Sequence, residues 1–288
     1  MLGVLGAGSL EAQSLDSILS SLALQAKTGV ESQWVYRGKE HSDLNTQTQV
    51  RGEYTLPPLI SNLGFYLDGG VFAMLPIEQS ACELTFNLGG KIAYENFSLL
   101  LGWNYYTFPN KNDVRHNFAA GGWTGGPTGG YQDSITNRPD YNRSQEVFIG
   151  LGVDFGGFYP MLRGLSAAVY AYYDLNLKQS TFEADITYRY EPSFLPRAAL
   201  TAQVFAGYLT ADAANGDQRA PGMPKWHNAY AYAGASIDLS YRLPNGFTEI
   251  GGGVRYGWNS DGSGKDDIRL SGNTKDNFWW GAWVKFSY

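Results

Sequence analysis

The sequence predicts an all-β fold, a closed antiparallel transmembrane β-barrel of about 12 strands. Three observations carry this prediction. Apolar residues recur at every second position in many segments, aromatic residues lie near the ends of the apolar faces, and the connections alternate between short and long. Period-two alternation is the signature of a strand with one apolar face.

Composition agrees with an all-β chain. Of the 288 residues, only 17% are charged, whereas aromatic residues reach 15% and there are 36 glycines. The net charge of −6 makes nucleic acid an unsuitable partner. The single cysteine, Cys82, excludes an internal disulfide framework and a cysteine-rich metal site. The sequence contains no run of about 18 apolar residues, so it predicts no transmembrane helix.

The first residues are expected to precede the barrel. Residues 1–12 are interpreted as the remnant of an export signal, although an ordinary disordered terminus fits as well. Residues 13–26 place leucine and isoleucine at helical spacing behind Ser14, which is a good N-cap, so a short amphipathic helix or leader is expected there. The barrel itself is expected over 27–288.

Twelve alternating segments follow one another, and their charged residues lie on the polar face. The approximate spans are 28–37, 47–56, 64–75, 82–95, 97–107, 146–155, 166–178, 181–191, 198–209, 228–242, 247–259 and 276–288. Lipid excludes charge from an apolar face, because a Lys or Arg at mid-membrane costs about 2–4 kcal/mol. A dry protein core excludes charge too, so alternation alone also fits a soluble barrel or sandwich.

Aromatic placement and connection length favour the membrane. Tyr and Trp gather near the ends of the apolar faces, as in Trp34 and Tyr36 or Tyr188 and Tyr190, and these residue types prefer the membrane–water interface. Most connections alternate between short turns and longer loops, the longest being residues 108–145. A membrane barrel has short turns at one end and long loops at the other.

The chain is expected to close through its last segment, NFWWGAWVKFSY, residues 277–288. Because no sheet edge can face lipid, this segment must pair with the first strand. The outward face is predicted to be Phe278, Trp280, Ala282, Val284, Phe286 and Tyr288, and the inward face to include Trp279, Trp283 and Lys285. The terminal aromatic resembles the C-terminal signal that outer-membrane barrels present to the barrel-assembly machinery.

Residues 29–72 resemble the opening of the TorF family of bacterial outer-membrane porins. The resemblance rests on GVESQWVYRGKEHSD, TQVRGEYTL and LGFYLDGGVF, and above all on Trp34-Val35-Tyr36-Arg37-Gly38. It implies a bacterial outer-membrane location and a porin-like role, with membrane lipid and lipopolysaccharide as surroundings, and it implies no particular substrate.

The inward face supplies the candidate site. The predicted pore-lining residues are Arg37, Arg51, Glu53, Asp68, Glu83, Lys91, Asp154, Asp174, Glu183, Asp185, Arg189, Asp238, Arg242, Glu249, Arg255 and Lys285, with Tyr170, Tyr172, Tyr230 and Tyr232 as inward aromatics. These charges fit a narrow aqueous pore, or a salt-bridged plug. The aromatics fit a track that stacks on sugar rings, or space-filling that narrows the lumen, and space-filling is favoured.

The predicted function is passive diffusion of small polar solutes or ions through this lumen, with a preference for cations because acidic residues are in excess. The alternative is a non-conducting surface barrel that stabilises the envelope or binds a partner through residues 108–145. We expect no enzyme: the three histidines lie in or beside loops and form no convincing catalytic pair. Nor do we expect a cofactor or metal.

Overall fold

Twelve strands close into one antiparallel barrel in the computed structural model. The structure describes residues 20–36, 39–42, 44–60, 62–77, 82–107, 143–175, 178–210, 229–260 and 275–288. The wall consists of β1 (Leu22–Glu31), β4 (Asn45–Ile60), β5 (Leu63–Pro76), β6 (Glu83–Tyr94), β7 (Phe97–Thr107), β8 (Arg143–Asp154), β9 (Leu165–Asp174), β10 (Gln179–Tyr190), β11 (Ala198–Leu209), β12 (Tyr230–Arg242), β13 (Thr248–Asn259) and β14 (Asp276–Ser287).

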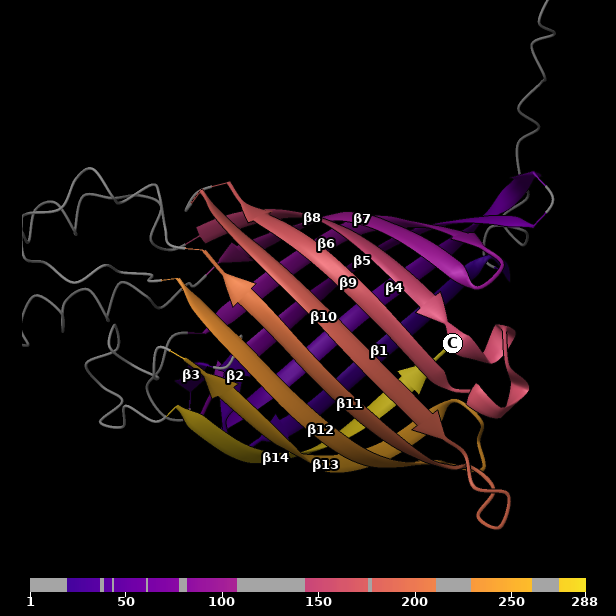
Figure 1. The fold of residues 1–288 in the computed structure, drawn as a ribbon. Helices are drawn as coiled ribbons and strands as arrows, with labels where there is room; N and C mark the ends of the chain where they lie inside the picture. The colour runs from indigo at the N-terminus through magenta and orange to yellow at the C-terminus, as the bar shows by residue number, and fades with distance from the viewer. Residues whose placement is uncertain are drawn as a thin grey trace, which may run out of the picture.

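The two ends of the barrel differ, as predicted. Short turns join β6 to β7, β8 to β9, β10 to β11 and β12 to β13 at one end, here called the turn end. The long connections 108–142, 211–228 and 261–274 join strands at the other end, the loop end. The strands run obliquely between the two ends (Figure 1). No helix in the described part of the chain is long and apolar enough to cross a membrane.

The first strand begins earlier than the sequence suggested. β1 is Leu22–Glu31, not 28–37, so residues 22–26 are strand rather than part of a helix; residues 1–19 lie outside the described residues. Trp34–Tyr36 form β2, which pairs only with β3 (Lys39–Ser42). Trp34 and Tyr36 therefore belong to a hairpin and not to the outward aromatic ends of the wall.

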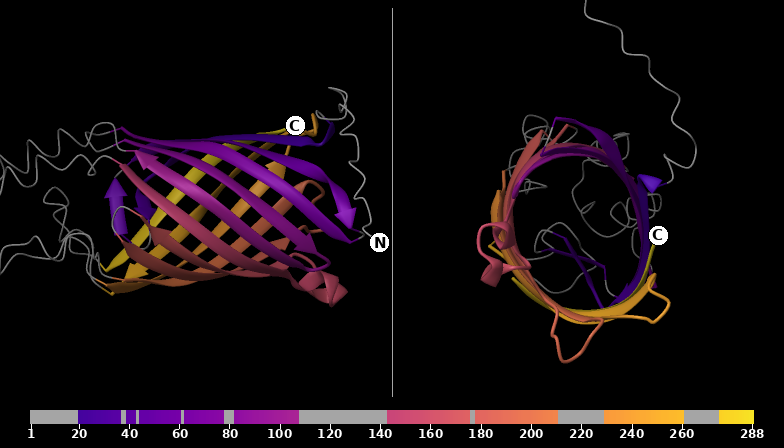
Figure 2. Two further views of the ribbon diagram at one scale, coloured as in Figure 1. Left: turned by 90° about the horizontal axis from the view of Figure 1, so that it is seen from above. Right: turned by 90° about the vertical axis from the view of Figure 1, so that its right-hand side faces the viewer.

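This β2–β3 hairpin folds inward at the loop end. Figure 2 shows it inside the outline of the wall when the barrel is viewed along its axis. The side chain of Val35 lies close to Gly257, an inward-facing residue of β13. A Cβ added to Gly257 would be 3.4 Å from Val35 Cγ1. At the base of the hairpin, Ser32 N–H donates to the Trp280 carbonyl, at 2.9 Å. The hairpin narrows the barrel from within.

The outward face of the wall is apolar. Large side chains such as Leu151, Ile186, Leu239 and Phe278 point away from the barrel and are about half exposed or more. Aromatic residues lie toward both ends of this face, as predicted. Asp276, the first residue of β14, is an exception to the predicted exclusion of charge, and it accepts a hydrogen bond from the Tyr256 hydroxyl at the loop end.

Closure occurs where β14 meets β1. The two strands pair from Gln25 opposite Ser287 to Glu31 opposite Gly281. Tyr288, the last residue, exchanges two backbone hydrogen bonds with Leu24, at 2.8 and 2.9 Å. The predicted pairing of the last segment with the first is confirmed, with the first strand shifted toward the N-terminus.

Gly29 tests how tightly this seam is packed. A Cβ at Gly29 would lie 2.4 Å from the Ala282 carbonyl oxygen and 2.8 Å from Trp283 Cβ. Gly29→Ala should therefore destabilise the barrel by about 1–3 kcal/mol, the usual cost of overpacking, measured by urea unfolding in detergent. Gly90→Ala is the control, because a Cβ there meets nothing closer than 3.4 Å. Equal stability of the two variants would contradict a tight seam.

Candidate functional site

The inward face of the wall carries the polar residues that the sequence predicted. Because directly paired residues of antiparallel strands share a face, the register places one set of residues inside all around the barrel. On the inward face lie Arg51, Glu53, Asp68, Glu83, Lys91, Asp174, Glu183, Asp185, Arg189, Asp238, Glu249, Arg255 and Lys285, together with Tyr170, Tyr172, Tyr230 and Tyr232.

Three predicted positions stand apart from this set. Arg37 lies outside the described residues. Asp154 is exposed at the turn end, where its carboxylate accepts a hydrogen bond from the Gly156 N–H, at 2.8 Å. Arg242 is exposed at the same end. The latter two residues lie at the rim and not in the middle of the lumen.

Several basic side chains of the wall pair with carboxylates. Arg51 Nη2 lies 2.6 Å from Asp68 Oδ2, and Lys91 Nζ lies 3.1 Å from Glu53 Oε2. Lys91 also lies 4.1 Å from the centre of the Tyr66 ring. Lys285 pairs with Glu249 nearer the turn end, at 2.5 Å. These pairs leave little unbalanced positive charge on this part of the wall.

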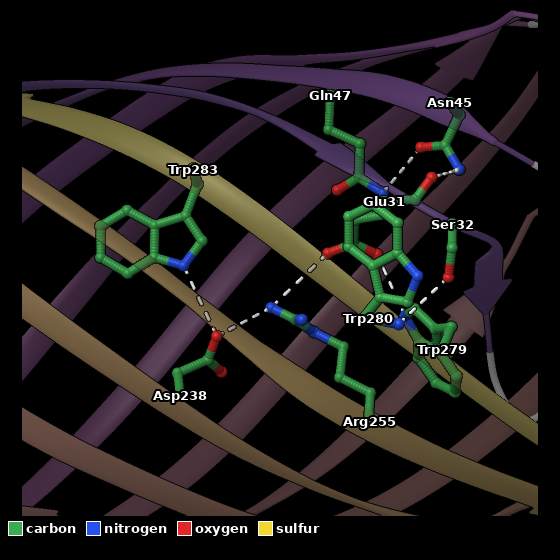
Figure 3. A network of polar contacts seen from close by, with 9 residues as sticks. All are labelled: Glu31, Ser32, Asn45, Gln47, Asp238, Arg255, Trp279, Trp280 and Trp283. Carbon is green, nitrogen blue, oxygen red and sulfur yellow. Dashed lines mark hydrogen bonds and ion pairs between the residues drawn. The ribbon is translucent and has the colours of Figure 1, made fainter.

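A larger network spans the seam (Figure 3). Arg255 Nη2, from β13, lies 3.1 Å from Asp238 Oδ1 of β12 and 3.6 Å from Glu31 Oε1 of β1. From β14, Trp279 Nε1 donates to Glu31 at 3.1 Å and Trp283 Nε1 donates to Asp238 at 3.5 Å. Four consecutive strands of the wall are thereby linked by side chains across the closure.

Glu31 was absent from the predicted set, as was Lys27, whose ammonium lies 4.7 Å from the centre of the Trp283 ring. Both stand on the inward face of β1. The alternation Lys27-Gly29-Glu31 carries the signal. Lys27 was missed because the first strand was placed too far along the chain.

Buried polar side chains gather at the loop end. Glu146, also missing from the prediction, is only 2% exposed, and it accepts hydrogen bonds from the Tyr106 hydroxyl at 3.0 Å and from Asn104 at 3.5 Å. Nearby Asp174 accepts one from Ser144. Asn259 and Asn277 are buried at the same end. The inward face at the loop end is therefore lined by buried polar side chains.

Asp185 has different surroundings. Its carboxylate is half-buried on β10 and accepts hydrogen bonds from the side chains of Gln203 and Thr187. Within the described ranges, no lysine or arginine forms an ion pair with it. The opposing residues on the neighbouring strands are Ala168 and Phe205. Asp185 thus places a carboxylate on the lumen wall with which no lysine or arginine of the described residues pairs.

The inward aromatic rings lie against the wall, over glycines of neighbouring strands. A Cβ on the glycine would collide with the ring in each of five pairs: Phe148 over Gly102, Tyr170 over Gly150, Tyr232 over Gly207, Phe205 over Gly234 and Trp283 over Gly251. Such a ring covers the gap that a glycine leaves in a sheet. The rings therefore lie along the wall and do not cross the lumen.

Burial separates the four predicted inward tyrosines. Tyr230 and Tyr232 are 5% and 1% exposed and pack with Leu209 and Phe205. Tyr170 and Tyr172 are half-buried and stack at 5.8 Å between ring centres. Packing of this kind favours the space-filling interpretation over a continuous aromatic track.

A closed sheet with an apolar exterior and a charged interior defines a transmembrane β-barrel. In hydrocarbon the backbone groups must pair within the wall, and closure satisfies this requirement without an edge. The exterior meets lipid through its exposed Leu, Ile, Val and aromatic side chains. Twelve strands enclose a lumen between the filled interior of eight-stranded barrels and the wide channels of 16-stranded ones.

Known structures include similar barrels. The chain is similar to the KdgM porin, with 11% identity and a TM-score of 0.46, over 92% of this chain and 99% of that one. It is similar to the NanC porin, with 12% identity and a TM-score of 0.45, over 91% and 98%. The β domain of the Bordetella autotransporter BrkA gives 9% identity and a TM-score of 0.40, over 93% and 98%.

No family model matches the chain, and no curated protein matches it significantly. The resemblance to the TorF family therefore stays a prediction. At identities of 9–12%, the similarity to solved barrels assigns no function.

Arg255 should matter more for stability than Arg51. Their side chains are 14% and 47% exposed. Arg255→Met would leave two carboxylates without their shared cation and should cost about 3 kcal/mol. Arg51→Met, which breaks an exposed pair, should cost less than about 1 kcal/mol. Urea unfolding followed by tryptophan fluorescence measures both, and adding Glu31→Gln and Asp238→Asn to Arg255→Met should recover part of the loss.

The inward hairpin predicts a specific cross-link. With Cys82→Ser as background, Val35→Cys and Gly257→Cys should form a disulfide under mild oxidation. A Cβ on Gly257 would lie 3.4 Å from Val35 Cγ1, an atom whose place a cysteine sulfur can take. Mobility on a non-reducing gel reports it. Val35→Cys with Thr201→Cys, an inward residue nearer the turn end, is the control. Similar cross-linking in both pairs would contradict a fixed hairpin.

Proposed function

We propose that the protein is a porin-like channel of the bacterial outer membrane, which lets small polar solutes or ions diffuse through a narrow charged lumen. The observation that carries the proposal is the contrast between the two faces of one wall, since the exterior is apolar and the interior is lined by charged and hydrogen-bonding side chains. An interior of that kind favours water and polar solutes over lipid.

Two features support a narrow passage. The β2–β3 hairpin occupies part of the barrel toward the loop end. On β4, the side chain of Arg51 points into the lumen and remains 47% exposed, although it pairs with Asp68. Passage is therefore proposed for ions and small solutes only.

The charge pattern supports a preference for cations. Arg51, Lys91, Arg255 and Lys285 each have a carboxylate partner within 4 Å, and Lys27 lies over the Trp283 ring. Asp185 accepts hydrogen bonds, but none of the described lysines and arginines pairs with it. A fixed carboxylate without a basic partner lowers the electrostatic cost of placing a cation beside it. Asp185 is the residue proposed to contribute most to selectivity in the middle of the wall.

The proposed partners follow from the same architecture. Membrane lipid and lipopolysaccharide would surround the apolar exterior. The last strand, β14, ends on aromatic residues with Phe286 and Tyr288 outward, which fits delivery to the barrel-assembly machinery through this strand. The resemblance of residues 29–72 to the TorF family agrees in location and class.

The alternative, a non-conducting surface barrel, has one observation in its favour. Polar side chains at the loop end of the lumen are fully covered, including Glu146, Asn259 and Tyr232. A barrel whose mouth is covered could serve envelope stability or partner binding. The partner was predicted to bind through residues 108–145; of these, 108–142 lie outside the described residues, and 143–145 begin β8. We propose no catalytic activity, and His41, His116 and His227 lie where the structure describes no side chain.

Conductance separates the two functions. Purified, folded protein added to a planar lipid bilayer should produce stepwise current, and a KCl gradient should give a reversal potential with the sign of a cation-preferring pore. A bilayer that contains inserted protein but carries no current would contradict the channel and support the non-conducting barrel.

Asp185 provides the residue-level test. Asp185→Asn should keep the current and move the reversal potential toward zero, because the unpaired negative charge is removed from the lumen. Asp276→Asn removes a carboxylate from the outward face and should leave the reversal potential unchanged. An equal shift in both variants would show that the selectivity has another origin.

A further inference from the structure

Three turns at the turn end expose large apolar side chains. The turn between β8 and β9 contains η2 (Phe155–Gly157) and η3 (Pro160–Leu162), and it carries Met161, 86% exposed, and Tyr159, 61% exposed. In the turn between β10 and β11, Phe194 is 82% exposed. Phe247, between β12 and β13, is 53% exposed. These four residues are here called the apolar tips.

The turns that carry the tips lie outside the outline of the wall. Viewed along the barrel axis in Figure 2, the segments 155–164, 191–197 and 243–247 project away from the barrel and not over its opening. These turns therefore project toward the side on which the apolar exterior lies. A cover over the lumen would have to project the opposite way.

The tips continue the apolar exterior of the wall. Phe158, beside Tyr159, packs edge-to-face on Phe97 of β7, with 5.6 Å between ring centres. Phe97 is itself on the outward face, where Tyr188 and Tyr190 of β10 are also exposed. The surface that meets lipid on the strands thus extends without a break into the turn between β8 and β9.

The backbone of these turns suits a water-poor boundary. Leu162 N–H donates to the Tyr159 carbonyl at 2.8 Å, and Arg163 N–H donates to that of Pro160 at 3.2 Å. In the next turn, Leu195 N–H donates to the Pro192 carbonyl, at 3.2 Å. Internal pairing lowers the cost of bringing a turn close to hydrocarbon.

Charge at the same turns fits lipid headgroups. Arg163 and Arg197 are exposed beside the tips, and guanidinium groups bind phosphate oxygens well. By contrast, the turn between β6 and β7 consists of Glu95 and Asn96 and carries no apolar tip. The apolar tips and the arginines occur together on the β8–β13 side of the barrel.

We propose that the apolar tips insert into the phospholipid leaflet next to the turn end, with Arg163 and Arg197 at the level of its phosphates, so that this side of the barrel is anchored at a fixed depth. The proposal rests on the proposed membrane location. It commits to lipid as the occupant, because the tips project outward and continue the lipid-facing wall.

Spin labels test the depth directly. With Cys82→Ser as background, single cysteines replace Met161, Phe194 or Phe247, so that each variant retains two of the three turns intact. The labelled full chain is reconstituted in vesicles of phosphatidylethanolamine and phosphatidylglycerol. Power saturation then compares collisions with oxygen, which concentrates in lipid, and with a water-soluble nickel chelate. Leu151→Cys provides a reference in the middle of the exterior and Glu95→Cys a reference at the polar turn.

Labels at the tips should collide more with oxygen, relative to nickel, than the label at Glu95, and less than the label at Leu151. A ratio equal to that at Glu95, with Leu151 in lipid, overturns the anchoring while the barrel stays in the membrane. Low collision rates with both reagents at the tips would mean that protein covers them, which also overturns it. A water-exposed label at Leu151 would instead contradict the proposed function.

Discussion

The pairing of every wall strand on both sides is the constraint on which the structure depends. β1 pairs with β4 along its whole length and with β14 from Gln25 to Glu31, so no strand of the wall has a free edge. In lipid an unpaired strand would leave a row of backbone groups without partners. Closure also fixes the register, and with a side-chain period of two, the register decides which residues face lipid and which face the lumen.

Closure of the wall limits the space available to large aromatic rings on its inward face. Large rings inside a barrel of this size would fill its centre if they stood upright on the wall. Instead, Tyr170 leans over Gly150 of β8, and Trp283 leans over Gly251 of β13. The glycines are therefore part of the lining, because they let the rings lie flat against the wall.

Sequence alternation predicted most of the wall because lipid imposes one rule on every strand. Residues 198–209 and 97–107 were placed with the observed bounds. The predicted bounds of the first strand were wrong for a physical reason. Trp34–Tyr36 alternates like a wall strand, but it belongs to a hairpin inside the barrel. Side-chain partners were not predictable either. Arg255 contacts Glu31 because closure brings β1 beside β14. The two residues are far apart in the sequence, and a local pattern does not predict such a contact.

The charged groups of the lumen divide into two physical kinds. Arg255 lies between the carboxylates of Glu31 and Asp238, which balance its charge. The same carboxylates accept hydrogen bonds from Trp279 and Trp283, so the group links the strands at the seam. Asp185 accepts hydrogen bonds from the neutral side chains of Gln203 and Thr187, and no lysine or arginine among the described residues pairs with it. A count of acidic and basic residues treats the two alike. In the proposed channel, the selectivity would depend on Asp185 and the stability of the seam on Arg255.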